Sequence, residues 1–250
     1  MIVLIDLDDT LLSNDMDKFQ GFYMQFLGDA LSSAAPANEV IRQVLEGTKK
    51  MITKTAISAT LEEVFDRSFY PALNTPRAAL QPQIDRFYAE VFPTLRRLTE
   101  PRPQMTALMA RMVASGWQVA VATKPLFPRT AVVQRLEWAG LPVETSGIAL
   151  FSTYENFHFS KPNPAYFAEL LYQLGWPEVP AVMIGNDLSD DIHPAVSLGL
   201  PAFLLLPEGA EPPAPLPALA AAGAVDALWP WLLERAQEKC PELPNSPASL

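Results

Sequence analysis

The pattern of apolar and polar positions predicts that strands and helices alternate over the second half of the chain. A short β-branched apolar run, Met1–Ile5, opens the sequence and is typical of a strand that is buried on both faces. From Pro101 onward, apolar runs of strand length alternate with segments of helical periodicity. The predicted helices span Met105–Ala114, Thr130–Ala139, Ala165–Leu174 and Ile192–Leu198, and the predicted strands span Val119–Ala122, Ile148–Phe151, Val182–Ile184 and Ala202–Leu206. This alternation predicts an α/β fold in which a doubly wound parallel sheet is covered by helices on both faces.

Glycine and proline mark the ends of these helices. The four helices end at Gly116, Gly140, Gly175 and Gly199, and glycine readily adopts the left-handed conformation that closes a helix. Asn163-Pro164 predicts a helix start, with Asn163 as N-cap and Pro164 at the first helical position.

The stretch between the first strand and the alternating region shows no strand signal. Thr60-Leu61-Glu62-Glu63 has the capping-box pattern that begins a helix. We therefore expect residues 13–99 to form an inserted α-helical cap domain, with residues 1–12 and 100–240 forming the α/β core. The helices predicted within the cap span Asp17–Leu31, Glu39–Ile52, Leu61–Phe69 and Gln83–Leu98.

The C-terminal region is interpreted from its composition. Pro207–Ala222 is rich in proline and alanine, which predicts an extended connection. A final helix is expected over Ala224–Lys239, and residues 241–250 are expected to be a flexible tail.

Charge narrows the range of partners. The 250 residues carry a formal net charge of -10, and the pI is about 4.7. Such an acidic surface disfavours nucleic acid and anionic membranes, so any phosphate site must be locally positive through a metal ion, a lysine or backbone amides. The single cysteine, Cys240, fits a reducing compartment, and no apolar stretch has membrane-spanning length. A cytoplasmic monomer or homodimer is expected.

Polar residues follow the predicted strands at four places. In a doubly wound sheet, ligands bind beyond the carboxyl ends of the strands. Each polar segment taken alone could be a solvated turn or a helix cap, but their joint occurrence, in order, favours a catalytic site. The segments are Asp6-Leu7-Asp8-Asp9-Thr10, Thr123-Lys124, Ser160-Lys161-Pro162 and Gly185-Asn186-Asp187-Leu188-Ser189-Asp190-Asp191.

These four segments resemble the motifs of the haloacid dehalogenase superfamily. The apolar run and Asp-x-Asp-x-Thr of Ile2–Leu11 match the first motif, and Val119–Thr123 matches the second. Lys161 matches the third motif, and Val182–Asp191 matches the acidic fourth. The resemblance implies a Rossmann-like core with a helical cap inserted after the first motif, and a magnesium-dependent phosphatase reaction.

The resemblance also implies roles for individual residues. Asp6 would be the nucleophile that forms an aspartyl-phosphate, and Asp8 would transfer protons to the leaving group and from the attacking water. Thr123 and Lys161 would stabilise the phosphoryl group as it transfers. Thr10 would help fix the loop at the substrate, and Lys124 could contact phosphate or be solvated.

Magnesium requires hard oxygen ligands. Asp6, the backbone carbonyl of Asp8 and the acidic loop after Ile184 would supply them. This chain carries Asn186 where the family usually has aspartate after the glycine. By register Asn186 takes the ligand position, whereas by charge Asp187 is the better ligand, together with Asp191. Asp190 or Asp191 could instead hold Lys161 in place.

The expected function is hydrolysis of a small phosphorylated metabolite. Asp8 argues against dehalogenation, since a departing halide needs no proton. Three alternatives remain: phosphonate hydrolysis, phosphomutase activity and a catalytically silent binding role. Phosphonate hydrolysis would need a lysine from the cap. His158 could touch the site or stabilise its loop, and the helically spaced aromatics could pack the cap or line the substrate pocket. The candidate cap lysines are Lys49, Lys50 and Lys54, and the aromatics are Phe19, Phe22, Tyr23 and Phe26.

Overall fold

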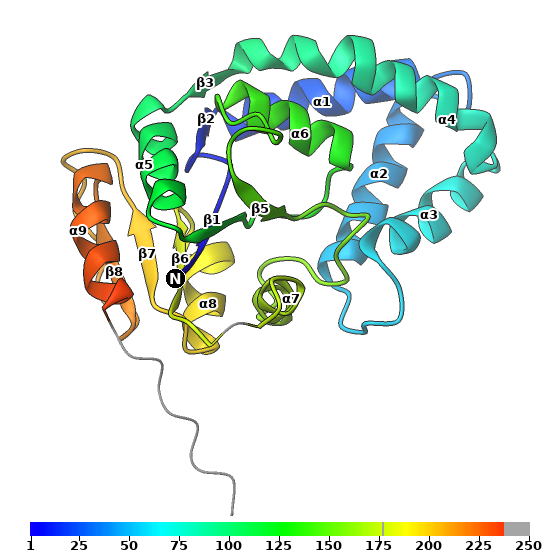
Figure 1. The fold of residues 1–250 in the computed structure, drawn as a ribbon. Helices are drawn as coiled ribbons and strands as arrows, with labels where there is room; N and C mark the ends of the chain where they lie inside the picture. Colours follow the sequence, from blue (N-terminus) through cyan, green and yellow to red (C-terminus); the bar gives the residue numbers. More distant parts are fainter. Residues whose placement is uncertain (177, 238–250) are drawn as a thin grey trace, which may run out of the picture.

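The core of the molecule is a six-stranded parallel sheet (Figure 1). The computed structural model describes residues 1–176 and 178–237. Because the chain adds strands first on one side of β1 and then on the other, the strand order reverses at β1. The order is β5 (Ile148–Phe151), β4 (Gln118–Val121), β1 (Ile2–Ile5), β6 (Ala181–Gly185), β7 (Ala202–Leu205) and β8 (Ala220–Gly223). The predicted doubly wound α/β fold is confirmed.

Helices cover both faces of this sheet, which explains why its strands are apolar throughout. Side chains alternate along a strand, so Val3 and Ile5 face one helical layer while Ile2 and Leu4 face the other. The first layer contains α5 (Pro103–Ala114), α6 (Arg129–Trp138) and α9 (Val225–Ala236), and the second contains α7 (Ala165–Gln173) and α8 (His193–Ser197).

The central strands end at the same level. Ile5 pairs with Val121 of β4 on one side and with Ile184 of β6 on the other. The residues that follow these strands therefore meet at one edge of the sheet.

Residues 13–99, called the cap below, are mostly helical. They contain α1 (Met16–Ala30), α2 (Ala37–Ile52), α3 (Leu61–Ala72) and α4 (Arg77–Arg86), then a π-helix η1 (Phe87–Val91) and a 3-10 helix η2 (Phe92–Leu98). The segment predicted as one helix, Gln83–Leu98, is helical throughout but is divided among the end of α4, η1 and η2. Pro93 lies in the first turn of η2 and cannot donate a backbone hydrogen bond, so regular α-helical bonding does not continue through it.

The two connections between cap and core pair with each other. β2 (Leu12–Asn14) and β3 (Thr99–Pro101) form an antiparallel two-stranded sheet. Neither three-residue strand is long enough to produce an alternating sequence pattern, so neither was expected. The pairing holds both ends of the cap beside the end of β1 (Figure 1).

The capping signals agree with the structure. The four helix-ending glycines have φ angles between 75° and 86°, and the Thr60 hydroxyl accepts a hydrogen bond from the Glu63 amide. Asn163 Oδ1 accepts a hydrogen bond from the Ala165 amide, and α7 begins at Ala165 as the predicted span has it, although the N-cap residue is Pro164 and not Asn163.

The region after β7 differs from the sequence interpretation. Pro207–Ala222 was expected to be an extended connection throughout, but its end enters the edge strand β8. Alanine has little intrinsic strand preference, and pairing with β7 decides its conformation. Residues 238–250, including the predicted tail, lie outside the described residues. No helix in the described part of the chain is both long and apolar enough to span a membrane.

Candidate active site

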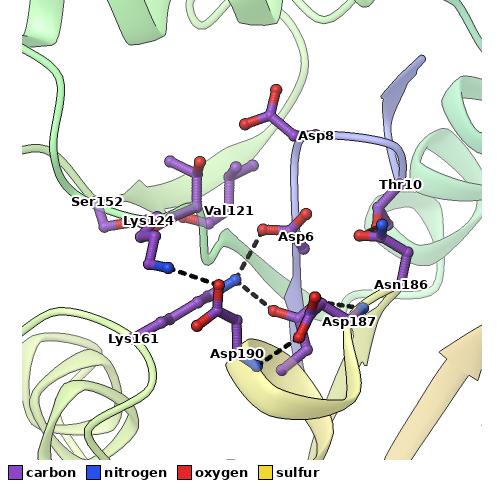
Figure 2. A network of polar contacts seen from close by, with 12 residues as sticks. Asp6, Asp8, Thr10, Val121, Lys124, Ser152, Lys161, Asn186, Asp187 and Asp190 are labelled. Atoms are coloured by element: carbon purple, nitrogen blue, oxygen red, sulfur yellow. Dashed lines mark hydrogen bonds and ion pairs between the residues drawn. The ribbon is translucent and has the colours of Figure 1, made fainter. Parts of the chain in front are cut away.

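A cavity of about 230 Å³ lies at the carboxyl ends of β1 and β6. Figure 2 shows the polar side chains that gather there from the loops after β1, β4 and β6 and from Lys161. Of the predicted residues, the cavity lining includes Asp6, Asp8, Lys124, Lys161, Asn186, Asp187 and Asp191.

Asp6 and Asp191 share one buried lysine. The Lys161 ammonium lies 2.7 Å from Asp6 Oδ1 and 2.5 Å from Asp191 Oδ1. Desolvation acts to lower the pKa of Lys161, but the charges of Asp191 and Asp6 outweigh it and raise that pKa above its ordinary value. Burial raises the pKa of Asp191 to about 7, since Lys161 and the Asp187 amide offset the desolvation only in part. The cluster thus holds one positive charge between two carboxyl groups.

Gly185 makes room for this cluster. It is the last residue of β6, and a Cβ atom placed there would lie 2.1 Å from Asp191 Oδ2. No pair of non-bonded heavy atoms tolerates that distance. The glycine of the fourth motif is therefore required because the Asp191 carboxyl group packs directly against its backbone.

We expect Gly185→Ala to displace Asp191 from Lys161. The free energy of unfolding should fall by about 1–3 kcal/mol, as for other overpacked core sites, and activity should fall with it. Gly21→Ala is the matched control, because nothing lies within 4 Å of a Cβ atom at Gly21 in α1. Alanine there should raise helix stability slightly. Denaturant unfolding of both variants checks this, and equal stability of the Gly185 variant and the wild type would contradict it.

The loop after β6 is held by its own acidic residues. Asp187 Oδ1 accepts hydrogen bonds from the amides of Ser189 and Asp190 at 2.7 and 2.8 Å, and so begins the π-helix η3 (Leu188–Ile192). The Asp187 amide in turn donates to Asp191 Oδ2 at 3.1 Å. Both oxygens of Asp191 are engaged in this way, which favours its interpretation as the residue that holds Lys161.

Asn186 lies on the other side of Asp6 from Lys161 (Figure 2). The buried Thr10 hydroxyl donates to Asn186 Oδ1 at 3.2 Å, which ties the loop after β1 to the loop after β6. Thr10 therefore acts through Asn186. Among the described residues that line the cavity, Asn186 is present and Thr10 is not.

The loop after β4 contributes a second lysine. The Lys124 ammonium pairs with Asp190 at 2.6 Å across the cavity. Thr123 is buried, and its backbone carbonyl accepts hydrogen bonds from the hydroxyls of Ser152 at 2.6 Å and Tyr166 at 2.8 Å. Among the described residues, the cavity lining includes Lys124 but not Thr123.

Asp8 is paired with an arginine that the sequence interpretation missed. The carboxylate forms an ion pair with Arg135 of α6 and accepts a hydrogen bond from the Asn14 side chain. Arg135 is buried beside the rings of Phe19 and Phe127, and burial lowers its pKa to about 10, so it remains charged at neutral pH. Arg135 lies one helical turn from Ala131 and Val132, on the apolar face of α6. A charged residue on such a face is the sequence signal that could have identified Arg135 as a buried partner of the site.

The remaining candidates lie away from the cavity. His158 Nδ1 lies 2.7 Å from Glu169 Oε1, and the His158 amide donates to the same carboxylate, as expected for a residue that stabilises its loop. Lys50 donates to the Ser68 hydroxyl, and Lys54 donates to the carbonyl of His158. In the part of the chain that the structure describes, the lysines that line the cavity are Lys124 and Lys161, and both come from the core.

The oxygen donors around the cavity suit magnesium. Among the described residues, no cluster of three or more histidine, cysteine, aspartate or glutamate side chains could hold a metal ion by itself. Magnesium, however, is usually bound by one or two carboxylates together with water and substrate phosphate. Asp6 and Asp187, which both line the cavity, provide such a set, with Asn186 as a further oxygen donor.

These features define a hydrolase site at the switch point of a doubly wound sheet. Comparison of the chain with known protein families identifies the family. A family model described as haloacid dehalogenase-like hydrolase matches residues 1–199. The chain belongs to this family, as its motifs predicted, and is therefore an enzyme. A search of curated proteins finds no match to the chain.

Solved structures share the whole fold at low sequence identity. A HAD phosphatase from Thermococcus onnurineus is 17% identical, with a TM-score of 0.58 over 94% of this chain and 99% of its own. A 2-haloacid dehalogenase from Pseudomonas syringae pv. Tomato DC3000 is 21% identical, with a TM-score of 0.62 over 93% and 98%. YfnB from Bacillus subtilis, solved with bound magnesium, is 16% identical, with a TM-score of 0.51 over 92% and 97%. At such identities the likeness defines the fold, and the reaction must be argued from the site.

Proposed function

We propose that this hydrolase is a magnesium-dependent phosphatase that cleaves a small phosphate monoester through an aspartyl-phosphate on Asp6. The observation that carries the proposal is the pairing of Asp6 with Lys161, beside a second carboxylate, Asp8, two residues along the same loop. A carboxylate with a fixed cation at one oxygen is oriented to attack with the other.

The chain's own residues account for the two steps. In the first, an oxygen of Asp6 forms a bond to phosphorus while the ester bond breaks, and Asp8 delivers a proton to the leaving oxygen. In the second, water attacks the aspartyl-phosphate, Asp8 accepts its proton, and inorganic phosphate leaves. Magnesium, held by Asp6, Asp187 and the carbonyl of Asp8, would neutralise the charge on the phosphoryl oxygens.

Asp8 must move for this chemistry. In Figure 2 its carboxylate is turned away from Lys161, and it pairs with Arg135 and Asn14. Rotation about its side-chain torsions brings the carboxylate back toward Asp6. The pair with Arg135 is therefore a resting position for the proton-transfer residue.

Asp8 also supports phosphatase over dehalogenase chemistry. A departing alkoxide needs a proton, whereas a halide does not. The lysines in the cavity come from the core, which gives a phosphonate hydrolase no cap amine with which to form a Schiff base. The direct test is to assay the purified protein, with and without magnesium, against acetyl phosphate, a panel of phosphate monoesters and 2-chloropropionate. Release of chloride without release of phosphate would overturn the proposal.

Magnesium dependence should rest on Asp187 more than on Asn186. We expect Asp187→Asn to raise the magnesium concentration needed for half-maximal activity by about 10-fold or more, since an amide oxygen neutralises less metal charge than a carboxylate. Asparagine is also a good N-cap, so this variant keeps the start of η3. Asn186→Ala is the comparison, and magnesium titrations of both variants decide between them. A larger shift for Asn186→Ala would make Asn186 the ligand.

A further inference from the structure

A second cavity of about 290 Å³ lies between the cap and the core and adjoins the catalytic one. The two cavities share part of their lining, namely Gln20 of α1 and Lys124, Leu126 and Phe127 of the loop after β4. A substrate whose phosphate lies at Asp6 would therefore extend past Phe127 into this second space. Its volume is close to that of the smaller ligand pockets of proteins, about 300 Å³.

The walls of this cap cavity are aromatic and aliphatic. Seven rings line it, from the cap and from the core loops, and aliphatic side chains of α1, α2 and α4 lie between them. Tyr23 and Phe127 lie with ring centroids 5.1 Å apart in an edge-to-face arrangement, so the rings are packed and not loosely placed. The rings belong to Tyr23, Phe65, Phe69, Tyr70, Tyr88, Phe127 and Tyr154.

Half of the polar side chains that line the cap cavity have partners within the protein, whereas Gln20, Thr48, Tyr70 and Tyr154 make no side-chain hydrogen bond in the described part of the chain. The hydroxyls of Tyr23 and Tyr88 bond to each other at 2.9 Å, and burial raises the pKa of Tyr23 to about 12, so the pair is uncharged. The Gln81 amide donates to Asp85 and accepts from Arg77. Among the described lining residues, Lys124 alone is charged, and it pairs with Asp190.

The apolar and polar groups that line the cap cavity determine which kind of leaving group can bind there. A sugar carries several hydroxyls, each of which loses its water on burial and needs a new partner. Among the described lining residues, the cap cavity offers unpaired polar groups at Gln20, Thr48, Tyr70 and Tyr154, but most of its wall is apolar, and an apolar wall binds apolar groups by removing them from water. Rings around the space further favour a flat aromatic group, which can pack against their edges and faces.

We infer that, given the phosphatase function proposed above, the substrate is a phosphate monoester of an alcohol that carries an aromatic ring. The ring occupies the cap cavity while the phosphate lies beside Asp6 and Lys161, in the catalytic cavity that both residues line. Hydrolysis breaks the phosphorus–oxygen bond of the ester, the alcohol leaves with the proton from Asp8, and water supplies the oxygen that completes inorganic phosphate.

Two phosphate esters of similar intrinsic reactivity test the inference. In both 2-phenylethyl phosphate and glucose 6-phosphate the phosphate is on a primary alkyl carbon, so the enzyme's preference reports the leaving-group pocket. We expect kcat/KM to be about 10-fold or more higher for 2-phenylethyl phosphate, the size of effect that apolar pockets give. An equal or higher value for glucose 6-phosphate overturns the inference.

A variant pair locates the preference in the cap cavity. Leu45 of α2 lines the cavity although its side chain is 53% exposed, so Leu45→Asp adds charge there without disturbing a core. Leu233→Asp, at a 42% exposed position of α9, is the matched control. Leu45→Asp should lower kcat/KM for 2-phenylethyl phosphate several-fold and leave acetyl phosphate hydrolysis unchanged. An equal loss for both substrates, or the same loss in the control, overturns the assignment.

Acetyl phosphate separates this inference from the proposed function. Its leaving group is too small to reach the cap cavity, so its hydrolysis reports only Asp6 and the metal. If acetyl phosphate is hydrolysed without any aromatic preference, the substrate class fails and the phosphatase function stands. If no phosphate ester is hydrolysed, the proposed phosphatase function is wrong. The cap cavity can then still be tested by nuclear magnetic resonance titrations that compare the binding of 2-phenylethanol with that of glucose. Preferential binding of glucose there overturns the inference.

Discussion

Replacing Asp6 by asparagine is expected to lower kcat by on the order of 10⁴-fold or more, as loss of a nucleophile does in other enzymes. The amide has nearly the same shape as the carboxylate but is a far weaker nucleophile. Lys161 keeps its ion pair with Asp191 in this variant, so the fold should survive. The measurement is steady-state hydrolysis of acetyl phosphate, together with acid-quench trapping of phosphorylated protein.

Asp9→Asn is the matched control for this experiment. Asp9 lines the same cavity, and its carboxylate accepts a hydrogen bond from the Asn14 amide at 2.8 Å, which an asparagine oxygen can also accept. Its φ of 54° is tolerated by asparagine as well as by aspartate. We expect activity within a few-fold of wild type. Trapped phosphoprotein in Asp6→Asn would rule out Asp6 as nucleophile, once mass spectrometry has excluded reversion to aspartate by deamidation.

Replacing Lys161 by methionine should give the largest loss of stability, about 3–5 kcal/mol, with loss of activity. Removing one partner of a buried ion pair leaves the other charge uncompensated, and here two carboxyl groups are left. Lys124→Met is the control, because Lys124 lines the same cavity but is 34% exposed and pairs with Asp190 near the surface. Its loss should cost at most about 1 kcal/mol.

The loss of stability in Lys161→Met, relative to wild type, should shrink as the pH falls from 9 to 7, the range in which Asp191 of the wild type is still largely ionised. Burial already raises the pKa of Asp191 to about 7 in the folded protein, and loss of the lysine raises it further. A carboxyl group with a raised folded-state pKa binds its proton more tightly when folded, so lowering the pH stabilises the variant relative to wild type. Denaturant unfolding of both proteins at the two pH values measures this. A loss of stability that grows as the pH falls would show that Asp191 is ionised without Lys161.

Local signals explain most of what could be predicted from the sequence. The left-handed glycines at the helix ends and the capping threonine act within a few residues, so the sequence alone places them. The strands of the core are buried on both faces and therefore appear as apolar runs. Polar residues directly after such runs must lie at one edge of a parallel sheet, which is why Asp6, Asp187 and Asp191 could be predicted near one another.

Features that depend on distant partners could not be predicted in this way. β8 is an alanine run that becomes a strand because β7 pairs with it, and β2 and β3 exist only as a pair. Arg135 lies far from the motifs in sequence, and only the packing of α6 beneath the loop after β1 brings it to Asp8.

The sequence by itself determined the fold class, the family and the charged residues of the four motifs at the site, because each depends on local patterns in a fixed order, but it did not identify Arg135. The tertiary structure decided which of those charges pair. Asp191 holds Lys161, Asp190 holds Lys124, and Asn186 bonds to Thr10. It also decided the character of the space beyond Asp6, since helices of the cap and loops of the core each contribute only part of the apolar wall. Pairing among several nearby carboxylates depends on ångström-scale distances and on burial, and no sequence spacing encodes either one.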